Sequence, residues 1–174
     1  MRLNNLDLDV LGGVMERGRS DTSVFRMHKR VEGRWSFDAG APGFTASVQH
    51  GSVTTELQVD VAPGFGGQGL APDPLQYMLA GLGACYAATL VTIAATEGIA
   101  LDAVSVVAEQ DVNVAAVYDL GDAPLMEQIS VSVKVAAGVD DATLTRWQDE
   151  ARAKCPFVYT VTNPIPLTTT VSRA

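Results

Sequence analysis

A chain of 174 residues, 47% hydrophobic and 18% charged, is long enough to bury a core, and we expect one compact globular protein. Its net charge of −8 argues against general binding to nucleic acid or to anionic membrane surfaces. The start, MRLNNLDLDV, lacks the basic region and long apolar core of a signal peptide, so two cysteines predict a reducing, cytoplasmic setting. The only histidines are His28 and His50 and there is no CxxC pair, so we expect no metal site.

The N-terminal residues 1–40 are mixed in character, and we interpret them as an arm that precedes a main domain of residues 41–174. Glycines and scattered charge predict that the first twenty or so residues are poorly ordered or extended, and Ser23 to His28 suggests a short strand. The basic run Arg26 to Arg30 is short within an acidic chain, so we interpret it as a solvated face or a functional arm. Turn character follows from Trp35 to Gly43.

A β-hairpin is predicted next. Apolar and polar residues alternate from Phe44 to Gln49 and again from Val53 to Val61, and His50-Gly51-Ser52 between them is a turn signal. The glycine-rich loop Pro63 to Pro72 follows. It lacks the GK[ST] ending of a phosphate loop, so we interpret it as a flexible lead-in to a helix.

The longest predicted element is a central helix within Pro72 to Gly98. No charged residue lies between Asp73 and Glu97, and alanine and leucine, both good helix formers, dominate the stretch. The apolar residues run all round rather than along one stripe, which is typical of a helix buried on every side. Gly81 and Gly83 weaken the helix, and we expect them to let another element pack very close to it.

A stretch of this length could also span a membrane. It has no flanking Lys or Arg, however, and predicted strands lie on both sides. Four polar residues dilute it: Gln76, Thr89, Thr92 and Thr96. We therefore favour a core helix and expect no membrane partner.

The C-terminal half is predicted to hold two strands, two helices and a final strand. Leu101 to Tyr118 and Gln128 to Ala136 are rich in alternating valine and predict a second hairpin. A helix is expected from Asp140-Asp141 to Lys154, and a short one from Cys155-Pro156 to Asn163-Pro164. Ile165 to Val171 reads as a last strand, which completes an α+β order of ββαββααβ.

The predicted helix that ends at Lys154 is amphipathic. Its apolar face consists of Leu144, Trp147 and Ala151. On its exposed side, opposite charges are spaced four residues apart, as Arg146–Glu150 and Glu150–Lys154.

The two cysteines are the candidate chemical groups. Cys155 is predicted near a helix N-cap, where backbone N–H groups lower the pKa of a thiol, although an inert buried cysteine is an equal alternative. Cys85 lies in the middle of the central helix, where burial raises the pKa of a thiol, so it needs a nearby cation to react. No Lys or Arg lies between Arg34 and Lys134. The cation must therefore come from the N-terminal segment, the C-terminal third or another subunit.

Two motifs resemble those of one family. PDPLQYMLAGLGACYAATL is similar to the central-helix motif of the OsmC/Ohr family, the osmotically inducible and organic-hydroperoxide-resistance proteins, and CPFVYTVTNPIPL is similar to its second-cysteine motif. The resemblance extends over about Phe44 to Val171. It implies an OsmC-like fold, in which antiparallel sheets wrap around a long buried central helix in an intertwined homodimer with active sites at the subunit interface.

The resemblance also implies a reaction. Cys85 would be the peroxidatic cysteine, which attacks an organic hydroperoxide and becomes a sulfenic acid. Cys155 would be the resolving cysteine, which closes a Cys85–Cys155 disulfide that an external dithiol then reduces. No bound cofactor is implied, and the partners are a second subunit, a small hydroperoxide and a dithiol reductant.

This chain departs from the family pattern beside the cysteine. Family peroxidases carry a Glu before the central helix, paired with an Arg, but that position is Leu75 here and the hairpin from His50 to Val61 contains no Arg. We predict Arg34 as the catalytic cation, with two nearby alternatives in Arg30 and Arg26. Asp73 or Glu56 would replace the acid.

Two other functions remain open from the sequence. One is a non-peroxidase family member that binds a small apolar ligand in the dimer cleft, with redox-sensing or idle cysteines. The other is a structural dimer whose thiols only pack. A guanidinium or ammonium within hydrogen-bond reach of Cys85 Sγ favours the enzyme, and its absence favours the binding protein.

Overall fold

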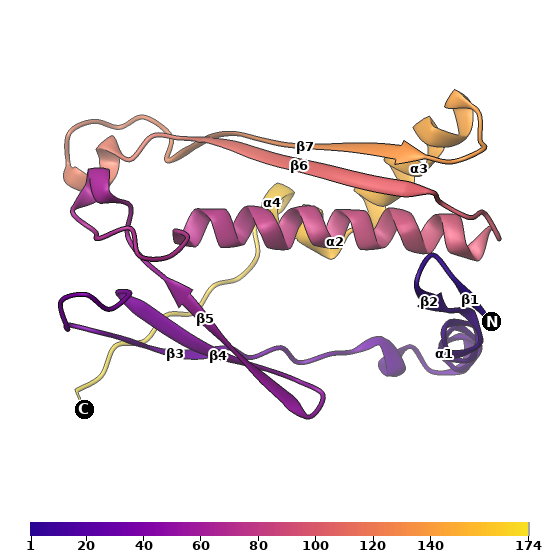
Figure 1. Ribbon diagram of the computed structural model, residues 1–174, viewed down its shortest axis with the longest axis horizontal. Helices are drawn as coiled ribbons and strands as arrows, with labels where there is room; N and C mark the ends of the chain where they lie inside the picture. Colours follow the sequence, from indigo (N-terminus) through magenta and orange to yellow (C-terminus); the bar gives the residue numbers. More distant parts are fainter. Residues whose placement is uncertain (174) are drawn as a thin grey trace. The chain divides into compact units, whose positions relative to one another are not determined.

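The computed structural model describes residues 1–173 of a mixed α+β protein (Figure 1). The chain divides into two compact units, and we take each by itself. One comprises Val10–Ala80. The other comprises Met1–Asp9 together with the chain from Gly81 onward.

The Val10–Ala80 unit contains a small antiparallel sheet in which β4 lies between β3 and β5. The register places Phe44 opposite Val59 and Trp35 opposite Phe44, so one edge of the sheet brings aromatic and β-branched residues together. The predicted hairpin with its turn at His50-Gly51-Ser52 is confirmed. The elements of this unit are α1 (Leu8–Ser20, which begins in the other unit), η1 (Thr22–Phe25), β3 (Glu32–Trp35), β4 (Phe44–His50), β5 (Val53–Val59) and η2 (Pro63–Phe65).

The N-terminal expectations were wrong in two places. The first twenty residues are not extended, because α1 covers Leu8–Ser20 despite its glycines, with Asp9 in its first turn and two arginines in its last, as the helix dipole favours. Ser23 to His28 is not a strand. The Asp21 side chain accepts hydrogen bonds from the Ser23 backbone N–H and hydroxyl and starts the short helix η1 instead.

A buried carboxylate organises the loop that leads to the central helix. Asp60 is 5% exposed, and its oxygens accept backbone N–H bonds from Gly43 at 3.2 Å, Val61 at 2.9 Å and Leu70 at 2.9 Å. The Leu70 bond is the largest of the hydrogen-bond effects that hold the pKa of Asp60 below its ordinary value. The only sequence signal for Asp60 is its position, as an acid between a strand and a glycine-rich loop.

Asp60→Asn is expected to destabilise the protein in a pH-dependent way. A depressed folded-state pKa contributes stability above the unfolded pKa of about 3.9, and this contribution is lost as the pH falls through the folded value. The difference in unfolding free energy between wild type and Asp60→Asn should thus be largest near neutral pH and shrink below about pH 4. Urea unfolding at pH 7 and pH 3.5 measures it. Asp38→Asn, on an exposed turn, is the control, and a pH-independent difference would contradict the assignment.

The second unit is built on the part of α2 from Gly81 onward. The hairpin β6–β7 runs along this part of α2, and α3 and α4 also pack against it (Figure 1). The predicted second hairpin and both C-terminal helices are confirmed. The first strand of the hairpin was predicted too long, because it ends at Val112 and Ala115–Tyr118 forms the short helix η3. The elements are β1 (Arg2–Leu3), β2 (Leu6–Asp7), α2 (Pro74–Thr96), β6 (Ala103–Val112), η3 (Ala115–Tyr118), β7 (Met126–Ala136), α3 (Asp141–Lys154) and α4 (Pro156–Thr162).

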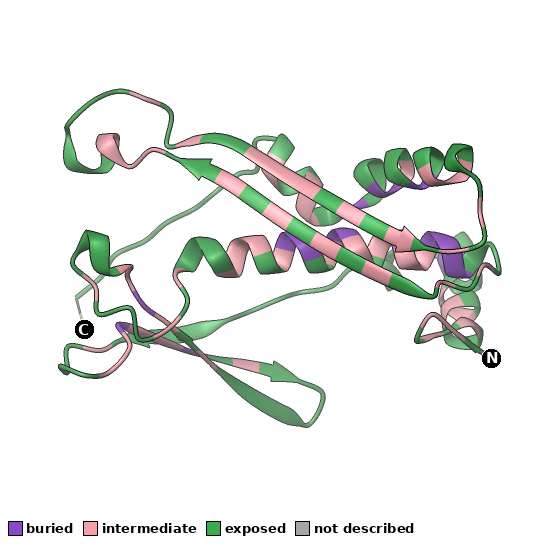
Figure 2. Ribbon diagram, turned by 45° about the horizontal axis from the view of Figure 1, so that its top comes forward, coloured by how far each residue is buried: buried purple, intermediate pink, exposed green. Residues whose placement is uncertain are grey.

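The hairpin β6–β7 presents an apolar face to α2 and a more polar face to solvent. Its residues alternate between half-buried and exposed, and Figure 2 shows none of them as buried. Val106 pairs with Val133, and Ala108 pairs with Val131 on the half-buried face. Alternation of this kind is typical of a sheet covered on one side only.

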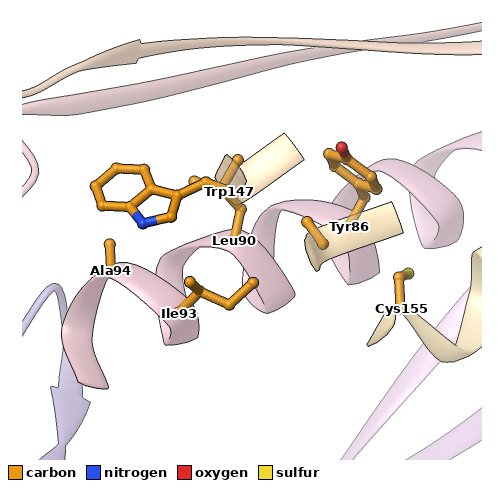
Figure 3. Packing of buried hydrophobic residues seen from close by; sticks show 7 residues of the cluster. Tyr86, Leu90, Ile93, Ala94, Trp147 and Cys155 are labelled. Carbon is orange, nitrogen blue, oxygen red and sulfur yellow. The ribbon is translucent and has the colours of Figure 1, made fainter. Parts of the chain in front are cut away.

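The core of this unit lies between α2 and α3 (Figure 3). Trp147 is fully buried over Leu90 and Ala94, and valines of β7 pack against the same cluster. The predicted apolar face of α3 is confirmed. The buried members of the cluster are Tyr86, Leu90, Ile93, Ala94, Trp147, Ala151 and Cys155.

The single chain does not cover α2 on all sides. Seven of its residues are buried, whereas Ala84 and Ala88 are exposed, so a helix enclosed in an intertwined homodimer stays a prediction. By length and composition, α2 would also qualify as a membrane span. Core helices of soluble proteins pass the same test, so it carries little weight here.

The predicted last strand was wrong. Ile165 to Val171 follows α4 without strand structure, and its apolar side chains are exposed, with Leu167 at 85%. An alternating pattern becomes a strand only where a neighbouring strand pairs with it. In the described part of the chain, no strand pairs with this segment.

Candidate active site at two thiols

The structure brings the two predicted cysteines together. Cys85 Sγ and Cys155 Sγ lie 3.5 Å apart, although the residues are 155 − 85 = 70 positions apart in the sequence. Both are free thiols. Cys155 is 1% exposed and Cys85 is half-buried, so the pair is open from the Cys85 side.

Helix caps fix the position of Cys155. Its N–H donates to the Ala151 carbonyl at 2.9 Å and closes the last turn of α3. Its carbonyl accepts from the Tyr159 N–H at 3.0 Å and opens α4, where Pro156 takes the first position. The predicted N-cap position of Cys155 is confirmed, at a joint between two helices.

Glycines on α2 make room for the elements around the thiols. A Cβ at Gly81 would lie 3.0 Å from the Phe157 ring, and one at Gly83 would lie 3.3 Å from Val106. Both distances are shorter than ordinary contacts, so a larger residue would push α4 or β6 outward. The expectation that these two glycines permit close packing is confirmed.

The surroundings of Cys85 disfavour its thiolate. Burial is the main cause that raises the pKa of the Cys85 thiol, and Cys155 raises it further, whereas the Phe157 backbone N–H bonds to Cys85 and lowers it. No Lys or Arg of its own unit, within the described residues, donates a hydrogen bond to Cys85 Sγ.

The predicted cation, Arg34, belongs to the Val10–Ala80 unit. It is exposed on β3 and lies opposite Thr45 in the antiparallel register. Arg34 and Cys85 belong to different units, whose positions relative to one another are not determined (Figure 1), so the role of Arg34 stays a prediction.

The predicted substitutes for the family's Glu have other contacts. Asp73 caps α2, where its Oδ1 accepts from the backbone N–H groups of Leu75 at 2.8 Å and Gln76 at 2.9 Å. Glu56 is exposed on β5, with the Gln58 amide 3.3 Å from its carboxylate. Leu75 itself is 37% exposed.

A polar contact between α3 and Glu97, the residue that follows α2, was not predicted from the sequence. Glu97 accepts two hydrogen bonds from Arg146, at 2.5 and 2.9 Å, and one from the Trp147 indole at 3.0 Å. The Arg146 hydrogen bonds, followed by the Trp147 bond, lower the pKa of Glu97 to about 2. The only sequence signal for this contact was the position of Glu97, the first charged residue after Asp73.

The unit that holds the thiols also has an open pocket of about 900 Å³, which neither cysteine lines. Leu82 and Tyr86, on either side of Cys85 in the sequence, line it together with valines of β7 and α4. Arg152 is a cationic side chain in its wall. Its lining is about equally polar and apolar, and a pocket of this size suits a small organic molecule.

A family profile described as OsmC-like protein matches residues 66–170, which include both cysteines and more than half of the chain. The chain belongs to the OsmC-like protein family. This profile match confirms the resemblance in the two cysteine motifs. A search of curated protein sequences finds no match.

Solved structures agree with an OsmC-like fold. An OsmC-like protein from Mycoplasma pneumoniae is 15% identical with a TM-score of 0.61, over 79% of this chain and 89% of that one. An OsmC-like protein of unknown function from Vibrio cholerae is 11% identical with a TM-score of 0.62, over 78% and 94%. An organic hydroperoxide resistance protein OsmC from Legionella pneumophila is 18% identical with a TM-score of 0.56, over 78% and 91%. At these identities the likeness shows the fold alone.

Proposed function

We propose that this OsmC-like protein is a thiol-dependent peroxidase that reduces organic hydroperoxides through Cys85 and Cys155. The observation that carries the proposal is the 3.5 Å separation of the two Sγ atoms. A disulfide needs the sulfurs at about 2.05 Å, so the pair closes with a movement of about 1.5 Å. The relative from Legionella pneumophila is described as an organic hydroperoxide resistance protein, which agrees with this chemistry.

The proposed reaction has two steps. The Cys85 thiolate attacks the outer oxygen of ROOH, the O–O bond breaks, and the departing alkoxide takes a proton to become ROH, which leaves Cys85 as a sulfenic acid. Cys155 then attacks Cys85 Sγ, the S–O bond breaks, and one water leaves as the S–S bond forms. An external dithiol, which a reducing cytoplasm would supply, then reduces the disulfide.

The pocket lined by Leu82 and Tyr86 would hold the organic part of the substrate. Its apolar residues would contact the R group, while Cys85 is reached from its half-buried side. The missing cation would come from the N-terminal segment of the same chain or of a second copy in a homodimer. We propose Arg34 for this role, because the charge distribution leaves the region from 35 to 133 without a Lys or Arg.

Stopped-flow mixing of the reduced protein with cumene hydroperoxide tests the function. We expect loss of both thiols far faster than a free thiol reacts, with a fall of about 2 Da in intact mass from disulfide closure. The same experiment with hydrogen peroxide at equal concentration compares the rate of thiol loss with a small peroxide to the rate with an organic one. Reaction no faster than that of free cysteine would reject the proposal.

Arg34→Ala is expected to slow the peroxide reaction at pH 7 by about 10- to 100-fold. An opposite charge nearby lowers a thiol pKa by about 1–3 units, and its removal lowers the thiolate fraction accordingly. The rate of Arg34→Ala should recover as the pH is raised, and Arg34→Lys should retain part of it. Arg19→Ala, which removes an exposed arginine of α1 paired with Glu16, is the control. A wild-type rate in Arg34→Ala would remove Arg34 from the mechanism.

A second candidate function is supported by the same pocket. If no cation reaches Cys85, the raised thiol pKa leaves a protein with slow cysteines and a partly apolar pocket. Such a protein would bind a small apolar ligand, with thiols that sense oxidants or stay idle. Tight binding of a non-peroxide apolar probe, without peroxide consumption, would favour this alternative.

A further inference from the structure

One part-buried polar contact joins the two helices that position the thiols. Tyr86 follows Cys85 directly on α2 and is 7% exposed, and its hydroxyl donates to the Gln148 carbonyl on α3 at 3.1 Å. Cys155 closes the last turn of α3 through the fully buried Ala151. The contact therefore connects the neighbour of one thiol to the part of α3 that ends at the other.

The Glu97 contact joins α3 to the residue that directly follows α2, far from the thiols. Glu97 lies 97 − 85 = 12 residues beyond Cys85, about 18 Å along the helix at 1.5 Å per residue. Its side chain is partly exposed at 30%, whereas Tyr86 is buried. The two contacts thus allow a comparison between a tie beside the thiols and a distant one.

The Tyr86 hydroxyl keeps its proton when a thiol loses one. Burial raises the pKa of Tyr86, and a negative charge on Cys155 raises it further, whereas Arg152 opposes this. The phenol can thus go on donating to Gln148 while Cys155 acts as a thiolate. A hydrogen bond between two neutral groups is also little screened by salt.

We propose that Tyr86 is a positioning residue for disulfide closure: its hydroxyl holds α3 against α2 and so keeps Cys155 within reach of Cys85. The inference rests on the proposed function, because it assigns Tyr86 to the second step of that reaction. In this step the Cys85 sulfenic acid and the Cys155 thiol form the disulfide and release one water. When α3 moves away, the sulfenic acid persists, and a second hydroperoxide molecule oxidises it to sulfinic acid.

Equilibration with glutathione tests the inference without peroxide. The exchange converts the two protein thiols and one oxidised glutathione into the protein disulfide and two reduced glutathiones. We expect Tyr86→Phe, which keeps the ring, to lower this equilibrium constant about three- to tenfold, as the loss of one hydrogen bond predicts. Tyr159→Phe, an exposed tyrosine of α4, should leave it unchanged. Glu97→Gln should lower the urea midpoint without lowering the constant.

The same variants separate positioning from stability. A purely structural role would lower the urea midpoint of Tyr86→Phe and leave the glutathione constant at the wild-type value, which would overturn the inference. An equal fall of the glutathione equilibrium constant in Tyr86→Phe and Glu97→Gln would overturn it as well. So would a wild type that forms no disulfide with glutathione. With cumene hydroperoxide, Tyr86→Phe should yield a larger fraction of sulfinic acid, per Cys85 oxidised, than wild type. A wild type that forms the disulfide in glutathione but ignores peroxide would refute only the peroxidase proposal.

Discussion

Cys85→Ser is expected to slow the reaction with cumene hydroperoxide by about a thousandfold or more, because the serine hydroxyl cannot replace a thiolate as the nucleophile. Cys155→Ser is expected to keep the first step near the wild-type rate. It cannot close the disulfide, so the sulfenic acid should accumulate on Cys85 and gain about 16 Da, with sulfinic acid at excess peroxide. The half-buried Cys85 and fully buried Cys155 explain this order of attack.

The comparison of the two variants is informative because both remove one sulfur from the same contact. Stopped-flow kinetics gives the rate of the first step, and intact mass gives its product. Equal loss of the first step in both variants would show that the nucleophile has been assigned wrongly. A fast first step in Cys85→Ser would assign it to Cys155.

Trp147→Ala is expected to lower the free energy of unfolding by about 3–5 kcal/mol, the usual cost of a large cavity in a core. Trp147 is 0% exposed and packs with Leu90, Ile93 and Ala94 of α2 (Figure 3). Its indole N–H also donates to Glu97 at 3.0 Å, and this bond is lost in the variant. Domains of this size have about 5–15 kcal/mol in total, so the variant should unfold at much lower urea concentrations.

The chain offers a matched control, because it contains two tryptophans. Trp35 is 53% exposed on β3, so Trp35→Ala should cost much less than Trp147→Ala. Trp147→Phe keeps a ring but loses the indole N–H, and it should fall between wild type and Trp147→Ala. Equal urea midpoints for Trp147→Ala and wild type would contradict the position of the core.

The elements predicted best were those with local end signals. Asp140 accepts from the Thr143 N–H at 2.8 Å and Pro156 follows Lys154, so the bounds of α3 could be read from the sequence. The predicted ion pairs are also present, at 3.1 Å for Arg146–Glu150 and 2.5 Å for Glu150–Lys154.

The errors came where local pattern and tertiary context disagree. The glycines of α1 predicted an extended segment, since glycine weakens a helix, but Leu8–Ser20 is helical. Alternation at Ile165 to Val171 predicted a strand, but a strand needs a pairing partner that sequence alone does not supply.

The candidate site could be predicted in its residues but not in its geometry. Cys85 and Cys155 were identified from their motifs, yet a separation of 70 positions gives no distance, and only the fold brings the thiols to 3.5 Å. Tyr86 and Glu97 were missed, because the sequence does not show which residue of another helix a side chain will bond to. The absence of a cation between Arg34 and Lys134 was visible in the sequence and agrees with the raised pKa of Cys85.

Peptide mapping after one equivalent of cumene hydroperoxide tests the account most directly. The reduced protein is oxidised, alkylated without reduction, digested and analysed by mass spectrometry. The account predicts one dominant cross-linked product, in which the peptide containing Cys85 is joined to the peptide containing Cys155 of the same chain. Two alkylated, unlinked cysteines, or disulfides only between chains, would contradict the claim that these thiols form one redox pair.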